Sequence, residues 1–132
     1  MTGFPLKIVT PDGLEFDGMA ESLTVRTVTG DMGIMAKHAD CVAPLGMGEA
    51  TVVIEGKKRY AACIGGMVSV IGGVVNLVPT TFEWADEIDV ERAEASEKRA
   101  QAVLANKNAT DTEIKLAKAR LRRALVRKNV RK

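Results

Sequence analysis

The sequence predicts a β + α protein, in which an N-terminal antiparallel β-sandwich is followed by a C-terminal antiparallel two-helix hairpin. Residues 1–82 consist of short runs rich in valine, isoleucine, threonine and leucine, separated by glycine-containing turns, which is typical of all-β domains. No proline occurs after Pro79, and residues 88–132 contain two segments with apolar residues at helical spacing. We therefore predict a sandwich domain over residues 1–86 and a helical domain over residues 87–132.

The strand-like runs of the first domain recur at intervals of about ten residues, as in sandwiches and barrels. In chain order they are LKIVT, LEF, SLTVRTVT, ATVVIEG, KRYAACIGG, MVSVIGG and VVNLVPT. Within SLTVRTVT, the side chains of Leu23, Val25 and Thr27 share one face of the predicted strand, because successive side chains alternate. Both Gly-Gly pairs, at 65–66 and 72–73, are predicted to form hairpin turns.

A membrane span is the alternative for residues 61–82, because these 22 residues contain no charged side chain. However, two Gly-Gly pairs, Ser69, Asn76 and Pro79 interrupt the stretch, and its valine-rich pieces are only five residues long. Pieces of that length fit the strands of a hairpin better than a helix. We expect no transmembrane segment, and the first residues do not show the pattern of a signal peptide.

The first predicted helix follows Asp89, whose carboxylate can accept a hydrogen bond from a free backbone N–H group of the first turn. Its apolar stripe comprises Ala93, Ala100, Val103 and Leu104. Residues 106–113 are predicted to form a turn, in which Thr110 or Asp111 caps the second helix. The second stripe comprises Ile114, Ala117, Leu121, Ala124 and Leu125. Alanine buries little apolar area, so we expect the hairpin to be only weakly stable by itself.

Composition and motifs argue against an enzyme or a metal protein. The chain has two cysteines, Cys41 and Cys63, and one histidine, His38, which are too few for a convincing zinc site. We expect both cysteines to be reduced and buried. His38, Asp40 and Cys41 share one segment but lack the positioning partner that nucleophilic catalysis requires. No glycine-rich nucleotide-binding motif is present, so the sequence predicts no catalytic site.

The net charge of +2 is unevenly distributed along the chain. Residues 111–132 contain nine Lys and Arg but only two acidic residues, whereas the rest of the chain has an acidic excess. One stripe of the second predicted helix comprises Arg120, Arg123, Arg127 and Arg131. This stripe can bind an acidic protein, an acidic membrane or the phosphates of nucleic acid, or it can be a solvated face. The helix has no aromatic side chain on which bases could stack, which argues against nucleic acid.

The segment IDVERAEASEKRA at 88–100 places Arg92 and Arg99 two turns apart on one side of the first helix. Guanidinium groups suit phosphate oxygens, and an antiparallel second helix would bring further cations alongside. A polyphosphate held between the two helices is therefore one hypothesis. The other is an ordinary solvated helix face, in which Asp89 and Arg92 form a weak local pair.

The segment GDMGIMAKHADC at 30–41 is predicted to be a structured surface loop. Its methionines, Met32 and Met35, can belong to the core or can form a contact surface, since methionine adapts to irregular contacts. Composition alone does not separate these two interpretations.

Three segments resemble the epsilon subunit of bacterial F-type ATP synthases, and the resemblance covers essentially the whole chain. They are LKIVTPDGLEFDGMAESLTVRTVTGDMGIMAKHA, GGMVSVIGGVVNLV and EWADEIDVERAEAS, followed by the helical end rich in Ala, Arg and Lys. The most specific features are the glycine-rich segment that ends at His38 and the junction at 83–93. The resemblance implies a β-sandwich followed by two helices, in agreement with the fold predicted from periodicity.

The resemblance also implies a non-catalytic subunit of the rotating central stalk, lying peripherally on the cytoplasmic side of the cell membrane. The sandwich would contact the gamma subunit and the ring of c subunits, with Asp31, Met32, Met35 and His38 in the contact loop. The helical pair would permit ATP hydrolysis when folded down and inhibit it when extended into the alpha/beta catalytic head. In the extended state the arginine stripe would face acidic surfaces of the head.

Some members of that family bind ATP in the folded state through the motif I/L-D-x-x-R-A, which begins here at Ile88. The resemblance implies that Asp89 contacts adenine or orients its surroundings, and that Arg92 and Arg99 contact the phosphates. The whole implied site comprises Glu83, Ile88, Asp89, Arg92, Ala93, Arg99, Arg122, Arg123 and Arg127. ATP is thus expected as an allosteric ligand, with or without Mg2+, and no catalytic cofactor is expected.

Two features qualify this interpretation. Trp84 stands where the resemblance leads us to expect a small residue, so it either packs in the fold or flanks the ligand.

The alternative function is a stand-alone binding module that uses its basic C-terminal helix to hold nucleic acid. Such a module would need neither the segment ending at His38 nor the junction at 83–93.

Overall fold

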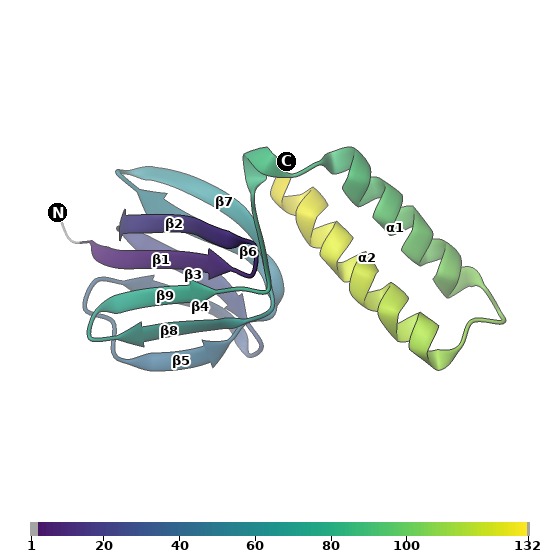
Figure 1. The fold of residues 1–132 in the computed structure, drawn as a ribbon, viewed down its shortest axis with the longest axis horizontal. Helices are drawn as coiled ribbons and strands as arrows, with labels where there is room; N and C mark the ends of the chain where they lie inside the picture. Colours follow the sequence, from purple (N-terminus) through teal and green to yellow (C-terminus); the bar gives the residue numbers. More distant parts are fainter. Residues whose placement is uncertain (1–2, 132) are drawn as a thin grey trace. The chain divides into compact units, whose positions relative to one another are not determined.

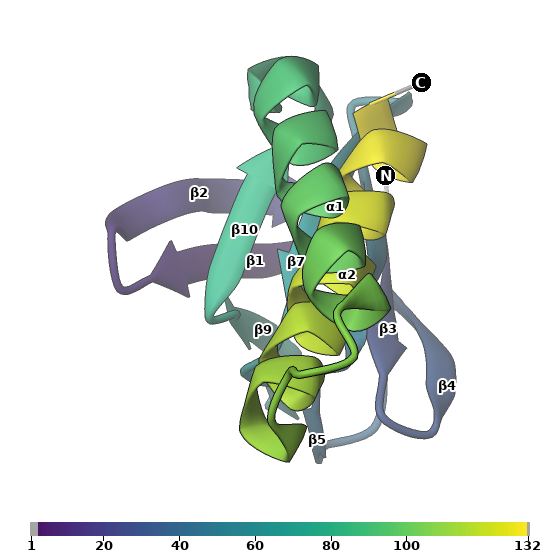
Figure 2. The ribbon, with the colours of Figure 1, turned by 90° about the vertical axis from the view of Figure 1, so that its right-hand side faces the viewer.

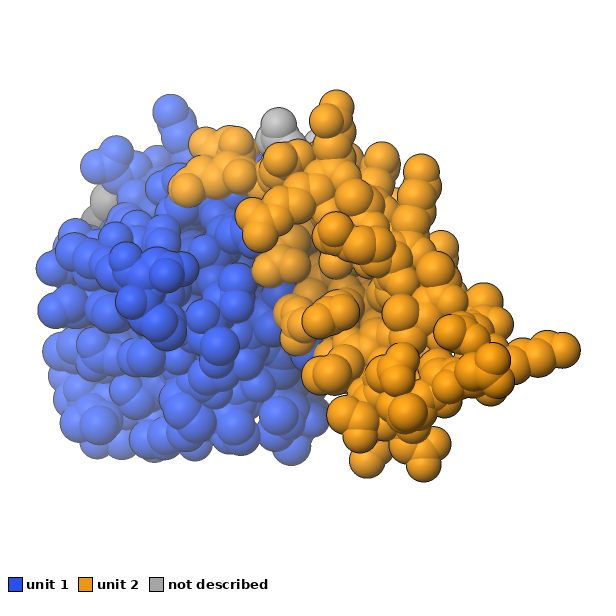
Figure 3. All heavy atoms as spheres, turned by 45° about the vertical axis from the view of Figure 1, so that its right-hand side comes forward, with its two compact units in different colours: residues 1–85 blue, residues 86–132 orange. Residues whose placement is uncertain are grey.

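The computed structural model describes residues 3–131, and of Arg131 it describes only the backbone. The chain forms two compact units, residues 1–85 and residues 86–132, which are coloured blue and orange in Figure 3. The strands of the described residues all lie in the first unit, and both α-helices lie in the second. The predicted order of a β domain followed by a helical domain is confirmed.

The first unit is a sandwich of two five-stranded sheets (Figures 1 and 2). The first sheet has the order β2 (Gly13–Ala20), β1 (Phe4–Thr10), β9 (Val74–Val78), β8 (Met67–Ile71) and β5 (Cys41–Pro44). The second sheet has the order β10 (Thr81–Trp84), β7 (Lys57–Ile64), β6 (Met47–Ile54), β3 (Ser22–Thr27) and β4 (Gly30–Met35). The predicted antiparallel sandwich is confirmed, with the addition that β1 and β9 pair in parallel and so join two hairpins.

The core lies between the two sheets. It consists of the side chains that face inward at every second position along the strands of both sheets. In β3 the side chains of Leu23, Val25 and Thr27 are buried, as predicted. The Thr27 hydroxyl accepts a hydrogen bond from the N–H group of Thr29 at 3.3 Å and donates one to the Gly30 carbonyl at 2.7 Å. A buried polar side chain is thereby satisfied, and it stabilises the turn between β3 and β4.

The two Gly-Gly pairs differ in what they connect. Gly72 and Gly73 form the predicted hairpin turn between β8 and β9, with positive φ angles of 58° and 81°. The prediction for residues 65–66 is wrong, because this pair carries the chain from β7 in the second sheet to β8 in the first. A side chain at Gly66 would collide with the backbone of Val78 and Pro79. Glycine is required there by a close approach of distant segments, which local sequence does not reveal.

Residues 30–35 also differ from the prediction, because they form strand β4 rather than a surface loop. The strand pairs antiparallel with β3 along its whole length and lies at one edge of the second sheet. Ile34 is buried and Met32 packs against the core, whereas Asp31 and Met35 are exposed. The two glycines of this strand have no side chain, so they hid the alternation on which the prediction of a strand depends.

At the boundary of the two units, the short 3₁₀-helix η1 (Ala85–Glu87) leads into α1 (Val90–Ala105). In the second unit, α1 packs antiparallel against α2 (Asp111–Arg131). The two-helix hairpin is as predicted. Thr110 caps α2, since its hydroxyl accepts a hydrogen bond from the N–H group of Glu113 at 3.1 Å and donates one to the Glu113 carboxylate at 3.1 Å. Of the two predicted caps, Thr110 is therefore the one that the structure uses.

The seam between the helices is built mainly from alanine. Ala93 and Ala100 of α1 and Ala117 and Ala124 of α2 are buried, as predicted. The prediction that Leu125 belongs to the same stripe is wrong, because this side chain is 41% exposed. One residue corresponds to about 100° around a helix, so Leu125 is turned away from the seam that Ala124 occupies.

The uncharged stretch of residues 61–82 forms strands, namely the end of β7, both strands of the β8–β9 hairpin and the start of β10. Within residues 3–131, neither helix combines the length and the apolar character that crossing a membrane would require.

Candidate functional site

The predicted ligand motif lies at the start of α1. Two of its residues, Asp89 and Ala93, have structural roles in the helix. The Asp89 carboxylate accepts a hydrogen bond from the backbone N–H group of Arg92, with 3.1 Å between Oδ1 and the nitrogen, so Asp89 is the predicted N-cap. Ala93 is buried, and its small side chain suits the close seam. The Arg92 side chain is exposed and serves neither purpose.

An ion pair across the hairpin shows which side of the seam each charged residue occupies. The Nζ atom of Lys128 lies 3.1 Å and 3.4 Å from the two carboxylate oxygens of Glu97. We call the side of the hairpin that this pair occupies the ion-pair flank. Arg92 and Arg99 lie about 140° and 160° around α1 from Glu97, so they lie on the opposite side of the seam. We call that opposite side the arginine flank.

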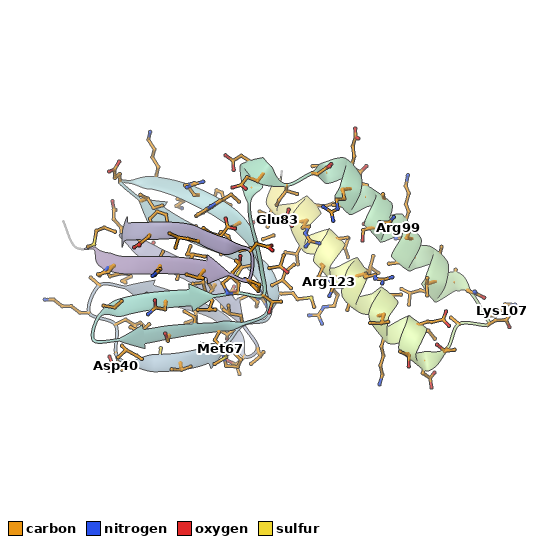
Figure 4. All side chains as sticks on the ribbon, viewed as in Figure 1. Asp40, Met67, Glu83, Arg99, Lys107 and Arg123 are labelled. Atoms are coloured by element: carbon orange, nitrogen blue, oxygen red, sulfur yellow. The ribbon has the colours of Figure 1, made fainter. Side chains whose placement is uncertain are left out.

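The second helix contributes to the same arginine flank. Helical spacing places three residues of α2 on the side of Ala124 that faces away from Lys128: Arg120, Arg123 and Arg127. Figure 4 shows Arg99 on α1 and Arg123 on α2. Five guanidinium groups from two helices thus line one side of the hairpin, which can bind a ligand with several anionic oxygens.

Two predicted residues are not placed on this flank. Arg122 precedes Ala124 by two residues and therefore points about 160° away from it, toward the outer side of α2. The side chain of Arg131, the last member of the predicted stripe, lies outside the described residues. The structure thus supports Arg92, Arg99 and Arg123 as neighbours in one flank more directly than it supports Arg122.

Glu83 belongs to the first unit, where it lies in β10 and pairs with Ala62 of β7 (Figure 4). The neighbouring Trp84 is only 4% exposed and packs edge-on against Phe82, with 4.9 Å between ring centroids. The Arg59 guanidinium covers the indole ring, with its carbon 3.7 Å from the ring centroid. Of the two alternatives for Trp84, packing in the fold is therefore the one that the structure shows.

The residues of the predicted rotor-contact loop do not form one cluster. Asp31 and Met35 share the outer face of β4, but four residues of extended strand separate them by about 13 Å. Asp31 forms an ion pair with Arg26 at 2.9 Å, and Met35 is 66% exposed. Met32 points the other way, against the core. The outer face of β4 thus offers a charged end and an apolar end.

His38 follows β4 in the turn that leads to β5. Its Nδ1 atom lies 2.7 Å from the Ala39 carbonyl oxygen, and the Cys41 sulfur lies 4.0 Å from the same nitrogen. The Nδ1–H group therefore donates to the backbone, which is the structural role expected of a loop histidine. The nearby Asp40 carboxylate accepts a hydrogen bond from the Gly72 N–H group at 2.9 Å and so ties this turn to the β8–β9 hairpin.

The described part of the chain offers no metal-binding cluster. Residues 3–131 contain no group of three His, Cys, Asp or Glu side chains that could hold a metal ion. Cys63 is buried, as predicted, whereas Cys41 is only partly buried. Burial raises the pKa of the Cys63 thiol to about 12, so this thiol is not a nucleophile near neutral pH.

The outer face of the first sheet has an exposed apolar surface that was not predicted from the sequence. The neighbouring strands β5, β8 and β9 expose large apolar side chains: Val42 in β5, Met67 and Ile71 in β8, and Val74 and Val78 in β9. Beyond β1, the edge strand β2 exposes Leu14 and Met19. Cross-strand pairing sets Met67 beside Val78 and Ile71 beside Val74. The continuous valine-rich runs were a signal, because a strand exposed on one side normally alternates with polar residues.

Comparison with known families accounts for both units. Residues 3–85 match the family described as "ATP synthase, Delta/Epsilon chain, beta-sandwich domain". Residues 86–131 match "ATP synthase, Delta/Epsilon chain, long alpha-helix domain". The chain belongs to the delta/epsilon chain family of ATP synthases.

Individual relatives agree with this assignment. The ATP synthase epsilon chain of Shouchella clausii is 37% identical over 132 residues, covering 100% of this chain and 97% of the relative. The epsilon chain of Bacillus velezensis is 40% identical over 125 residues, covering 95% and 94%. The resemblance to bacterial epsilon subunits is confirmed, and these relatives are subunits of an ATP synthase rather than separate enzymes.

Solved structures show the same fold. A chain in the mitochondrial ATP synthase of Euglena gracilis, described as an assembly of OSCP, F1 and c-ring, matches with a TM-score of 0.80 and 25% identity, over 91% of this chain and 76% of that chain. A chain of the central stalk and c-ring of the Tetrahymena thermophila enzyme matches with a TM-score of 0.63 and 16% identity, over 97% and 96%.

Proposed function

We propose that this chain is a non-catalytic rotor subunit of an F-type ATP synthase, joining the gamma subunit to the c-ring in the central stalk. The observation that carries this proposal is the match of both units, along the whole chain, to bacterial epsilon chains. It would then lie peripherally on the cytoplasmic side of the cell membrane, as part of the assembled enzyme. The alternative of a stand-alone nucleic-acid module has no observation in its favour beyond the basic charge of α2.

The surfaces of the sandwich support two different contacts within this role. On the outer face of the first sheet, β5, β8 and β9 form an apolar part, whereas β1 and β2 expose the charged side chains of Lys7 and Asp17. The apolar part suits a permanent partner with an apolar surface, for which we propose gamma. The outer face of β4, with Asp31 at one end and Met35 at the other, suits the c-ring. Replacing Ile71 with Asp should therefore weaken binding of gamma, whereas Asp31→Ala should leave it unchanged.

For the helical unit we propose regulation of ATP hydrolysis, with ATP as an allosteric ligand of the closed hairpin. The support is the arginine flank, in which guanidinium groups from α1 and α2 face the same side. A ligand that binds only the closed state stabilises it by about 2.7 kcal/mol at a hundredfold excess over Kd. Falling ATP would release the helices to extend into the alpha/beta head, where the same arginines would meet acidic surfaces.

The test is a calorimetric titration of the full chain with ATP, with and without Mg2+, and with inorganic triphosphate as a second ligand. We expect Arg92→Gln and Arg99→Gln each to weaken binding at least tenfold, because each removes a charged hydrogen-bond donor to phosphate. Arg122→Gln is the matched control, since it removes the same charge from the outer side of α2. Equal losses in all three variants would show general charge attraction instead of a site.

Asp89 needs its own control, because Asp89→Ala would remove the helix cap together with any contact to the nucleotide. Asp89→Asn keeps a capping side chain and removes only the charge. If Asp89→Asn binds ATP as the wild type does, the residue acts through the helix start alone.

In the assembled enzyme, replacing Arg120, Arg123 and Arg127 with Gln should relieve inhibition of ATP hydrolysis, and unchanged inhibition would remove these arginines from the mechanism.

A further inference from the structure

The ion-pair flank has not been assigned a role so far, although it contains the ion pair that joins the two helices. Glu97 and Lys128 are 31 residues apart in the chain, and two hydrogen bonds of 3.1 Å and 3.4 Å connect them. The pair lies in the middle of α1 and in the last turns of α2. It therefore holds the middle of α1 to the part of α2 that is farthest from the connecting turn of residues 106–110.

The fully buried part of the seam provides little apolar area to hold the hairpin closed, and the larger side chains of Val103, Leu104, Ile114 and Leu121 are only partly buried. The seam is formed largely by alanines, each of which buries only one methyl group. On the arginine flank, closing the hairpin brings Arg99 of α1 toward Arg123 of α2, so like charges there oppose closure until an anion neutralises them. The closed state therefore depends on contributions from outside the seam.

We propose that the Glu97–Lys128 ion pair is a latch that keeps the α1–α2 hairpin closed when no anion occupies the arginine flank. The latch and the arginine flank lie on opposite sides of one seam, so they act on the same opening motion independently. An anion closes the hairpin from one side by removing repulsion. The latch closes it from the other side by attraction, and its strength sets the population of open hairpin in the absence of ligand.

Amide hydrogen exchange of the full chain tests the latch directly. At 16 residues, α1 is close to the length below which an isolated helix is marginal in water, so separation from α2 exposes its amides to exchange. Glu97→Gln and Lys128→Gln should each speed exchange in α1 and α2 at least about two- to fivefold, because an exposed ion pair already contributes that much and this pair is partly buried. Exchange in the sandwich strands serves as the internal reference and should not change.

The double variant Glu97→Gln/Lys128→Gln completes a cycle that isolates the pair. It should exchange as fast as either single variant, because the second change removes nothing further once the pair is broken. Glu94→Gln and Lys118→Gln are matched controls, which remove the same charges one turn away on α1 and three turns away on α2. High salt should reduce the difference between wild type and variants, since it screens the pair. Effects that multiply in the double variant, or equal effects in the controls, would overturn the latch.

The consequence for the enzyme rests on the proposed regulatory function, and a separate measurement keeps the two apart. In the assembled ATP synthase, Glu97→Gln should strengthen inhibition of ATP hydrolysis about two- to fivefold at low ATP. Faster exchange together with unchanged hydrolysis would retain the latch and contradict the regulatory role. Unchanged exchange would overturn the latch, whatever happens to hydrolysis.

Discussion

The sandwich and the helical hairpin of this chain bury very different side chains. The sandwich core contains large side chains that are almost completely buried, such as Leu6, Ile8, Leu23 and Leu77, packed between two sheets. The fully buried side chains of the hairpin seam are alanines, and one ion pair lies on a flank of this seam. Burial of a leucine stabilises a fold by about 1.5–3 kcal/mol, whereas an alanine methyl contributes well under half of that. The two units therefore differ in how much buried apolar area holds each of them together.

The largest effect is expected from a cavity in the sandwich. Leu77→Ala should lower the free energy of unfolding by about 2–5 kcal/mol, because Leu77 is fully buried and its neighbours cannot fill the space. Trp84, the single tryptophan, lies in the sandwich, so its fluorescence during denaturation measures this unit alone. Ala100→Gly in the seam should instead move the helical circular-dichroism transition and leave the fluorescence midpoint unchanged. Coincident transitions in both variants would show that the two units unfold as one.

The corner between the sheets should be almost as sensitive. Gly66→Ala combines a φ angle of +91° with a collision against the backbone of Val78 and Pro79, so we expect a loss of about 2–4 kcal/mol. Gly73→Ala is the matched control, with a φ angle of +81° but open space around the added methyl group. It should cost only about 1 kcal/mol in the same denaturation measurement. Equal losses would mean that backbone conformation, and not the close approach, makes Gly66 necessary.

A smaller effect is expected from raising the pH, through Cys63 in the sandwich. Burial raises the pKa of Cys63 from 9.0 to about 12, so the thiol ionises in the unfolded chain before it ionises in the folded one. The sandwich should keep its full stability below about pH 9 and lose about 1.4 kcal/mol per pH unit between the two pKa values. Fluorescence-detected denaturation at pH 8 and pH 10.5 measures this slope. Cys63→Ala should remove the part of this loss in unfolding free energy that comes from ionisation of the thiol. An identical slope in Cys63→Ala would show that the thiol does not cause the loss.

The smallest effect is expected at the start of α1. Asp89→Ala removes the hydrogen bond to the Arg92 N–H group and should destabilise the helix by about 1 kcal/mol. Asp89→Ser retains a capping oxygen and should cost less than half as much. The helical circular-dichroism signal and its melting temperature report both changes. A loss in the Trp84 fluorescence midpoint would show instead that the cap stabilises the sandwich as well.

Some features of the candidate functional site can be predicted from the sequence, and others require the structure. The motif that begins at Ile88 and the arginine stripe are visible as sequence, because helical spacing relates residues that are near in the chain. The sequence alone does not predict which arginines share the arginine flank, because this depends on which side of α1 packs against which side of α2. The Glu97–Lys128 pair, which answers that question, joins residues 31 positions apart and has no local signal.

The sequence by itself determined the order of the two domains, the alternation of β3, the cap at Asp89 and the alanine seam, because each depends on residues only a few positions apart. Only the tertiary structure decided the strand at residues 30–35, the sheet-crossing glycines at 65–66, the parallel pairing of β1 with β9 and the apolar outer face of the first sheet. These features depend on contacts between distant segments, and a local pattern of residue types contains no information about which distant segment will lie alongside.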